Sequence, residues 1–218
     1  MKLEKTTRRR YDDACGAAHA MELLGERWAL LVVRELLWSP KRFGELRTGL
    51  PAISANVLSQ RLGELEAAGV VCRRTLPPPA NVAVYDLTEW GREAEPIFQA
   101  LGRWAARSPA HDPTLPISAA SVLGSLRTML DPARAEGVAM VVGLEMGAER
   151  YRLTLSGGEL RVALGAAEDA DVVMAGLPKL IAATIYGGQP VETVLAKGST
   201  AAARRFVDLF LLPERAEA

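Results

Sequence analysis

The sequence predicts an α+β fold divided into two domains, and three observations lead to this prediction. A helical repeat of apolar residues, followed by two β-prone runs, lies in the first half of the chain. A proline-rich stretch at 108–117 has no periodicity and is typical of a linker. Beyond it, alternating apolar residues give way to helical patterns. We therefore expect a first domain over 11–107, the linker over 108–117, and a second, α+β domain over 118–212.

The helix predicted between Ser54 and Gly69 has two different faces. Ser54 suits its N-cap, because the hydroxyl can accept a hydrogen bond from a free backbone N–H of the first turn. Leu58, Leu62 and Leu65 follow at spacings of four and three, so they share one stripe that must be buried. Gly69 then ends the helix as a C-cap. The opposite face is small and polar and comprises Asn56, Ser59, Gln60 and Gly63.

The polar face of this helix carries amide side chains in its N-terminal half. Asn and Gln can bond base edges bidentately, adenine above all, and recognition helices present their N-terminal residues to the major groove. An ordinary amphipathic helix with a solvated polar face explains the helix alone equally well. The residues on the C-terminal side of the helix therefore decide between the two interpretations.

Two β-prone runs, 70–76 and 82–88, follow the helix directly. Pro77, Pro78, Pro79 and Asn81 between them cannot continue a strand ladder and suit the tip of a hairpin. A helix followed by a β-hairpin is typical of a winged helix-turn-helix domain. The sequence thus predicts double-stranded DNA as the partner, with the helix in the major groove.

Basic residues surround this predicted reader. Arg73 and Arg74 alternate faces on the first strand, so that one of them can reach a phosphate or the minor groove. Lys41 and Arg42 precede a short helix, 43–48, which would be the first helix of the helix-turn-helix; we expect phosphate contacts from them, which position a protein without specifying sequence. For any single arginine, a surface ion pair is the alternative. The predicted DNA-binding set is Lys41, Arg42, Ser54, Asn56, Ser59, Gln60, Arg61, Arg73 and Arg74.

Short motifs occur in a fixed order over residues 11–107: Cys15, Leu23–Trp28, Arg42–Leu46, Ile53-Ser54, Leu58, Arg61-Leu62, Leu65-Glu66, Gly69–Val71 and Tyr85–Gly91. In this order they resemble the HxlR-type transcription regulators, bacterial relatives of the MarR winged helices. The resemblance implies a homodimer on a near-palindromic operator, with recognition helices about 34 Å apart. It also implies dimerisation through the N-terminal segment and the helix after the wing, about 92–106. There Ile97, Leu101 and Trp104 form an apolar stripe that needs a cover.

Cys15 is a candidate redox sensor by the same resemblance, since a cysteine at this place senses oxidants or electrophiles in some family members. The chemistry needs a thiolate, which a helix N-terminus or nearby cations favour. Asp12 and Asp13 oppose it, and Gly16 stands where the family often has proline. The alternative is a small, inert residue. Cys72, on an apolar-rich strand, is expected to serve packing.

The second domain is predicted as an antiparallel meander covered by helices. Residues 138–146 form a nearly continuous apolar strand, and Tyr151, Leu153 and Leu155 alternate with polar residues on the next. After a Gly157-Gly158 turn, Leu160, Val162 and Leu164 continue the alternation, and 170–175 is a fourth strand. After a first helix that contains Val122 and Leu126, closing helices are expected at about 178–186, 191–196 and 200–211.

Residues 120–212 resemble the sterol carrier protein fold through the Gly157-Gly158 turn, Asp171–Val173, Gly187-Gly188, Gly198 and a final helix with two phenylalanines. In that fold an apolar tunnel between sheet and helices holds a fatty acyl chain or a sterol. The resemblance therefore implies an apolar small molecule as effector. Simple covering of the sheet by the helices is the alternative use of the same side chains. The candidate lining residues are Leu180, Ile181, Ile185, Val194, Phe206 and Phe210.

Composition narrows the remaining classes. The net charge is zero, but residues 1–110 carry 16 Lys and Arg against 13 Asp and Glu, whereas residues 111–218 carry 10 against 13. The predicted DNA-reading half is thus mildly basic, and local placement of charge matters more than the total. Residues 1–13 lack an apolar signal core and no run approaches transmembrane length, so we expect a cytoplasmic protein without membrane contact.

Enzymatic and metal-binding functions find no support in the sequence. Two cysteines without CxxC spacing argue against a metal site and a disulfide scaffold. We find no nucleophile–base pair, no phosphate loop and no carboxylate dyad, so we expect no catalytic residues and no cofactor. The leading hypothesis is a dimeric, sequence-specific DNA-binding repressor whose second domain binds an apolar effector. The alternative is a lipid carrier whose winged helix serves protein contacts.

Overall fold

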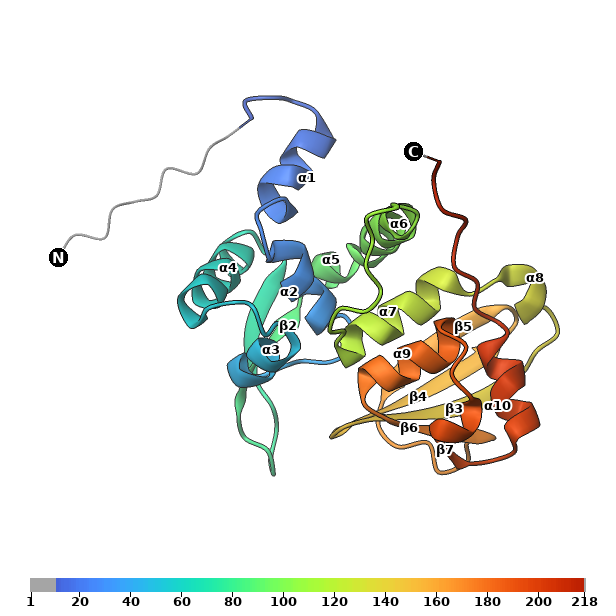
Figure 1. The fold of residues 1–218 in the computed structure, drawn as a ribbon. Coiled ribbons are helices and arrows are strands. Elements are labelled where there is room, and N and C mark those ends of the chain that lie inside the picture. The colour runs from blue at the N-terminus through green and yellow to red at the C-terminus, as the bar shows by residue number, and fades with distance from the viewer. Residues whose placement is uncertain (1–10, 218) are drawn as a thin grey trace.

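The computed structural model describes residues 11–217 (Figure 1). Residues 1–10, which hold most of the segment expected to lack a signal core and part of the expected dimerisation segment, lie outside the described residues, as does residue 218. Two hydrophobic cores follow each other along the chain. The first runs from Ala29 to Ala94 and the second from Ala119 to Phe210. Trp38 packs against both, so the two cores meet at this residue.

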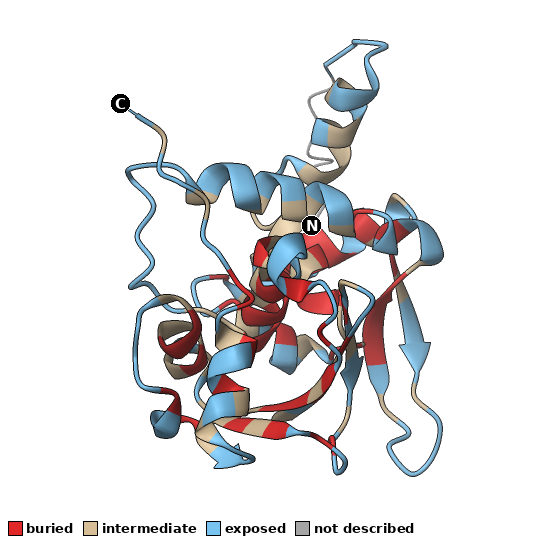
Figure 2. Cartoon of the chain, turned by 90° about the vertical axis from the view of Figure 1, so that its right-hand side faces the viewer, coloured by how far each residue is buried: buried red, intermediate tan, exposed pale blue. Residues whose placement is uncertain are grey.

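The first core is built by helices and one hairpin. In chain order these elements are α1 (Gly16–Leu24), α2 (Ala29–Leu36), α3 (Phe43–Gly49), α4 (Ala55–Ala67), β1 (Val71–Thr75), β2 (Ala83–Leu87), α5 (Glu89–Arg92) and α6 (Glu95–Ala106). Helix α1 projects from the rest and carries no buried residue, as Figure 2 also shows. The helix-turn-helix is α3 followed by α4, and the β1–β2 hairpin is the wing. The α+β character and the winged-helix order of this half are confirmed.

Helix α4 begins and ends where the sequence predicts. The Ser54 hydroxyl accepts from the backbone N–H of Val57 at 3.3 Å, which caps the first turn. At the other end Gly69 adopts φ +74°, and the N–H groups of Gly69 and Val70 bond back to the carbonyls of Glu66 and Leu65. This pairing is a Schellman motif, which favours glycine because the left-handed conformation strains other residues. The predicted apolar stripe of Leu58, Leu62 and Leu65 is buried.

The second core lies under a five-stranded sheet. Its elements are α7 (Ala119–Met129), α8 (Pro132–Ala135), β3 (Met140–Met146), β4 (Glu149–Ser156), β5 (Glu159–Leu164), β6 (Val172–Gly176), α9 (Pro178–Tyr186), the 3-10 helix η1 (Val191–Thr193), β7 (Leu195–Lys197) and α10 (Thr200–Val207). The strand order is β5-β4-β3-β6-β7. Helices α7, α9 and α10 gather on one face of the sheet (Figure 1). Tyr151, Leu153 and Leu155 point to that face and are buried, as the alternation predicts.

Three predictions for the second domain are wrong in detail. The sheet is not a pure meander, because β6 lies beside β3 and runs parallel to it. The connection from β5 to β6, residues 165–171, is too long for a hairpin and carries the chain across to the other edge of β3. The expected helix at 191–196 is instead η1 and the edge strand β7, which pairs with β6. The final helix ends at Val207, and Phe210 forms a bridge with Leu130 beyond it.

The six residues expected to line an apolar tunnel are part of the closed second core. Ile181 and Phe206 have no exposed surface, and Ile185, Val194 and Phe210 are at most 6% exposed. The rings of Phe206 and Phe210 pack edge to face, with centroids 5.0 Å apart. Only Leu180 is half-buried. The side chains therefore fill the space between sheet and helices themselves, and the prediction of an open tunnel there is corrected.

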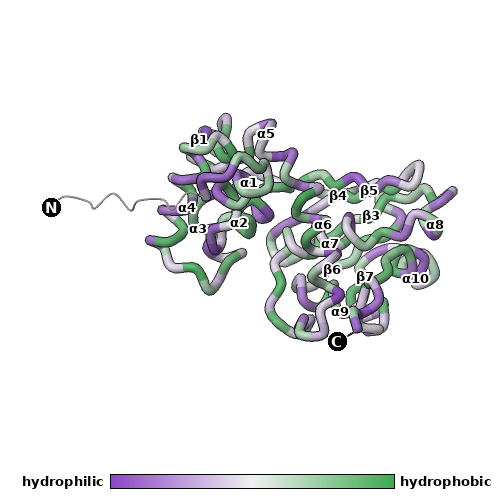
Figure 3. The backbone as a smooth tube through the Cα atoms, turned by 90° about the horizontal axis from the view of Figure 1, so that it is seen from above, coloured by the Kyte–Doolittle hydropathy of each residue, from purple (hydrophilic) through white to green (hydrophobic). Residues whose placement is uncertain are grey.

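The two domains lie side by side, joined where α2 and α6 meet α7 (Figure 3). The indole N–H of Trp38 donates to the carbonyl of Ala120 at 3.0 Å, and Arg127 pairs with Glu95 at 3.0 Å. Phe98 of α6 packs so closely on Gly124 of α7 that a Cβ at 124 would lie 2.9 Å from its ring. Close packing and specific polar contacts thus fix the second domain against the first.

Truncation of Phe206 tests whether this part of the second domain is a filled core. Phe206→Ala should lower the free energy of unfolding by about 3–5 kcal/mol, because it leaves a cavity in close-packed surroundings. Urea denaturation measures the change. Leu164→Ala, at a side chain that is 59% exposed, is the control and should stay within about 0.5 kcal/mol of the parent. A loss for Phe206→Ala no larger than that of the control would mean that the side chain borders open space.

Candidate nucleic-acid interface

The exposed face of α4 presents the predicted base-reading residues. Asn56, Ser59, Gln60 and Gly63 are all exposed, and α4 lies on the side of the first domain away from the second (Figure 1). The side-chain amide of Gln60 donates to the Glu64 carboxylate at 3.0 Å. A base contact by Gln60 therefore requires this exposed bond to break. Ser54 uses its oxygen as a cap, which leaves its O–H free to donate.

Arg61 does not lie on this face. Its side chain is 10% exposed, and the guanidinium pairs with Glu64 at 2.7 Å and with Glu26 at 3.4 Å. Because a DNA phosphate can only reach an exposed donor, the prediction of DNA contact by Arg61 is corrected. Arg61 instead ties α4 to the segment between α1 and α2.

Lys41 is also buried, at 5% exposure, and points away from solvent. Its Nζ atom lies 2.9 Å from the Glu149 carboxylate of the second domain and 3.6 Å from Glu35. The expectation of a phosphate contact is therefore wrong for Lys41. The sequence could not reveal this, because Glu149 is 108 residues away along the chain.

The remaining predicted arginines differ in how available they are. Arg42 is exposed at the N-terminus of α3, where its backbone N–H donates to Glu45 at 2.6 Å, and its side chain is left for other partners. Arg73 is exposed on the wing, with its guanidinium 5.0 Å from the centre of the Tyr85 ring. Arg74 pairs with Asp86 at 2.7 Å. Arg42 and Arg73 are thus the more available cations.

Arg47 is a further exposed cation that the sequence reasoning missed. It lies in the last turn of α3, next to the buried Leu46. Within residues 11–217 its side chain makes no ion pair or hydrogen bond. The sequence could have indicated its exposure, because successive residues on a helix point in different directions and the apolar Leu46 before it was expected to be buried. Arg42 and Arg47 on α3 and Arg73 on β1 are thus exposed cations on the elements that accompany α4 in the winged helix-turn-helix.

The stripe on α6 is exposed as expected. Ile97 and Leu101 are 48% and 46% exposed, and Trp104 is 73% exposed. The opposite side of α6 is already occupied, because Phe98 packs on α7 and Arg103 donates to the carbonyl of Thr128 at 2.7 Å. Only the outer side of α6 is therefore available to a second chain.

Cys15 is an exposed free thiol at the N-cap of α1. The backbone N–H groups of Ala18 and then Ala17, at the start of α1, lower the pKa of this thiol below its ordinary value. Cys72 is half-buried on β1. The two cysteines therefore differ in their access to solvent reagents, with Cys15 the more accessible.

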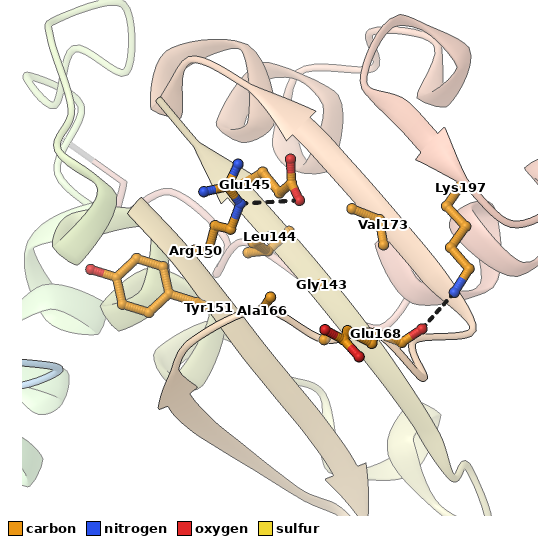
Figure 4. A pocket seen from close by; sticks show the side chains of 10 residues that line it. Gly143, Leu144, Glu145, Arg150, Tyr151, Ala166, Glu168, Val173 and Lys197 are labelled. Atoms are coloured by element: carbon orange, nitrogen blue, oxygen red, sulfur yellow. Dashed lines mark hydrogen bonds and ion pairs between the residues drawn. The ribbon is translucent and has the colours of Figure 1, made fainter. Parts of the chain in front are cut away.

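A shallow cavity of about 200 Å³ lies on the outer face of the second sheet (Figure 4). Its floor is Gly143, Ala166 and Val173. At one end Arg150 pairs with Glu145 at 3.4 Å, and at the other Lys197 donates to the carbonyl of Glu168 at 2.7 Å. The charged groups of Arg150, Glu145 and Lys197 are thus paired with neighbours, and no pattern in the sequence predicted this cavity.

No helix within 11–217 is both long and apolar enough to cross a membrane. No group of three His, Cys, Asp or Glu side chains in the same range is placed to hold a metal ion.

The sequence of the first domain is similar to known proteins. The HxlR-like helix-turn-helix family matches residues 23–112. The HTH-type transcriptional regulators YvaP and YodB of Bacillus subtilis are each 41% identical to the chain over 86 residues, which is 39% of this chain and 80% and 77% of theirs. The solved reduced form of YodB is 38% identical and covers 44% of this chain and 94% of its own, with a TM-score of 0.40.

The chain therefore belongs to the HxlR-like helix-turn-helix family, and it is a transcriptional regulator of the HxlR and MarR type. Its DNA-binding element is the winged helix-turn-helix formed by α3, α4 and the wing. The matched region ends just beyond α6, so the second domain lies outside it.

Proposed function

We propose that this regulator is a homodimer that binds a near-palindromic operator in double-stranded DNA and represses transcription by occupying it. The observation that carries the proposal is the exposed polar face of α4, together with exposed cations on α3 and the wing, the other elements of the winged helix-turn-helix. In this arrangement Asn56, Ser59 and Gln60 read base edges in the major groove. Arg42, Arg47 and Arg73, assisted by Ser54 and Arg74, hold phosphates or the groove rim and fix the register.

The outer stripe of α6 supports dimerisation. Ile97, Leu101 and Trp104 expose apolar surface that a second copy of the chain would cover, and α1 has no buried residue of its own. A two-fold symmetric dimer presents two copies of α4, which matches an operator with two half-sites about 34 Å apart. Repression is the simplest outcome of such binding, since it needs only occupancy of the site.

A sterol carrier-like fold for the second domain is supported by its five-stranded sheet, which helices cover on one face. An apolar effector in this domain would have to displace core side chains such as Phe206. Lipid carriage as the main function has less support for the same reason. The operator-binding function depends on neither.

Cys15 is proposed as the oxidant- or electrophile-sensitive residue of the regulator. Its support is an exposed thiol whose pKa is lowered by the backbone at the start of α1, a helix that the proposed dimer would cover. Modification there would change how α1 meets a partner chain.

Replacement of Gln60 tests base reading. On a duplex selected by the wild-type protein from a randomised pool, Gln60→Ala should cost about 1–3 kcal/mol of binding free energy, and it should cost far less on a scrambled duplex. Arg73→Ala is the matched variant: it should weaken both duplexes alike and reduce the salt slope by about one unit. Fluorescence anisotropy measures both. Equal losses on both duplexes for Gln60→Ala would refute its base-reading role.

The pH dependence of alkylation tests Cys15. In a Cys72→Ser variant, the rate of reaction with iodoacetamide should rise with pH and level off around an apparent pKa below about 8.5, the ordinary thiol value, because the lowered pKa yields thiolate earlier. The alkylated protein should bind the selected duplex more weakly. An apparent pKa at or above the ordinary value, or unchanged DNA binding after alkylation, would contradict the sensing role.

A further inference from the structure

The backbone of Lys41 is hydrogen-bonded to the wing. Its N–H donates to the carbonyl of Tyr85 at 2.9 Å, and the N–H of Tyr85 donates back to the carbonyl of Lys41 at 2.8 Å. Lys41 therefore pairs with β2 as a one-residue bridge. It lies on the edge of β2 opposite to β1, the strand that carries Arg73. The next residue, Arg42, is the N-cap of α3. A shift of the Lys41 backbone would thus move both the wing and the start of the helix-turn-helix.

The side chain of Lys41 is held by the second domain. Its Nζ atom lies 2.9 Å from the Oε2 atom of Glu149, and both lie where the first residue of β4 meets the first domain. The same carboxylate oxygen accepts from the hydroxyl of Tyr151 at 2.5 Å. Burial and the neighbouring Glu149 raise the pKa of Tyr151 well above its usual range, so this hydroxyl remains a donor. Tyr151 is itself buried in the second core, at 1% exposure, so its hydroxyl holds the Glu149 carboxylate from the side of that core.

Glu35 is the more distant carboxylate partner of Lys41. Its Oε1 atom accepts from Arg34 at 2.7 Å and from the Ser118 hydroxyl at 2.6 Å, whereas its buried Oε2 atom lies 3.6 Å from Nζ and has no hydrogen-bond partner among the described residues. It is also closely packed, because a Cβ added at Gly49 would clash with its Oε2 atom. The short ion pair that orients the lysine is therefore the one to Glu149.

We propose that Glu149 is a positioning residue for DNA binding: from the second domain it holds Lys41, and through Lys41 the wing and α3, in the geometry that contacts DNA. The inference rests on the proposed operator binding and names a regulatory route into it. Any event that displaces the turn between β3 and β4 would release Lys41 and loosen the wing. The second domain thereby controls operator affinity without touching DNA.

Neutralising Glu149 tests the proposal through DNA affinity. Glu149→Gln should weaken binding to the selected duplex about tenfold, in the range of ordinary coupling between sites. The salt slope should stay unchanged, because no phosphate contact is lost. Glu145→Gln is the matched control: it removes a carboxylate of the same sheet whose one ion pair within residues 11–217 is with Arg150, and it should leave affinity unchanged. Tighter binding with a slope steeper by about one unit would mean that Glu149 sequesters a phosphate-binding lysine, and it would overturn the proposal.

A double-mutant cycle shows whether Glu149 acts through Lys41. In a Lys41→Met background, Glu149→Gln should have no further effect on duplex affinity, whereas simple addition of the two losses would contradict the coupling. Thermal unfolding of each variant separates a loss of fold from a loss of positioning.

Hydrogen exchange provides a readout that needs no DNA. In Glu149→Gln the backbone N–H groups of Lys41 and Tyr85 should exchange faster, while those within β3 and β4 keep their protection. Unchanged exchange at Lys41 and Tyr85 would refute the proposal even if Lys41→Met does not fold. Failure of the wild-type protein to bind any duplex would count against the proposed function alone, and exchange would still decide the role of Glu149.

Discussion

The burial of Glu35 is the constraint on which the arrangement of the two domains depends. Its carboxylate has no exposed surface, and a buried charge is tolerated only when cations and hydrogen-bond donors surround it. Those partners come from both domains: Arg34 and Lys41 from the first and the Ser118 hydroxyl from the start of α7. Removing one partner of such a pair typically costs about 3–5 kcal/mol. The carboxylate can therefore be buried only when the second domain is docked.

This docking decides which surfaces of the regulator stay available. Helix α2, which carries Glu35, is covered by α7, and one side of α6 is closed by Phe98 on Gly124. The polar face of α4, the wing and the outer stripe of α6 around Trp104 remain exposed. These are the surfaces that a dimer on DNA requires. The second domain thus occupies the side of the winged helix that needs neither DNA nor a partner chain.

Local patterns in the sequence predicted those parts of the structure that short-range physics determines. The Ser54 cap, the leucine stripe of α4 and the hairpin depend on neighbours within a few residues, and the structure confirms them. Lys41 looked like a phosphate contact because its carboxylate partner, Glu149, lies in another domain. Arg61 pairs locally with Glu64, three residues along α4, but its burial and its longer pair with Glu26 depend on the tertiary fold. The parallel placement of β6 was missed for a similar reason, since strand order depends on where a long connection leads and not on alternation.

Operator binding as proposed requires two copies of this chain to read one duplex through α4. Native mass spectrometry of the protein mixed with the selected duplex measures this stoichiometry directly. We expect one complex that contains the duplex and twice 23.4 kDa of protein, with no complex of a single chain at comparable abundance. A stable complex of one chain per duplex, or a protein dimer that never includes DNA, would contradict it.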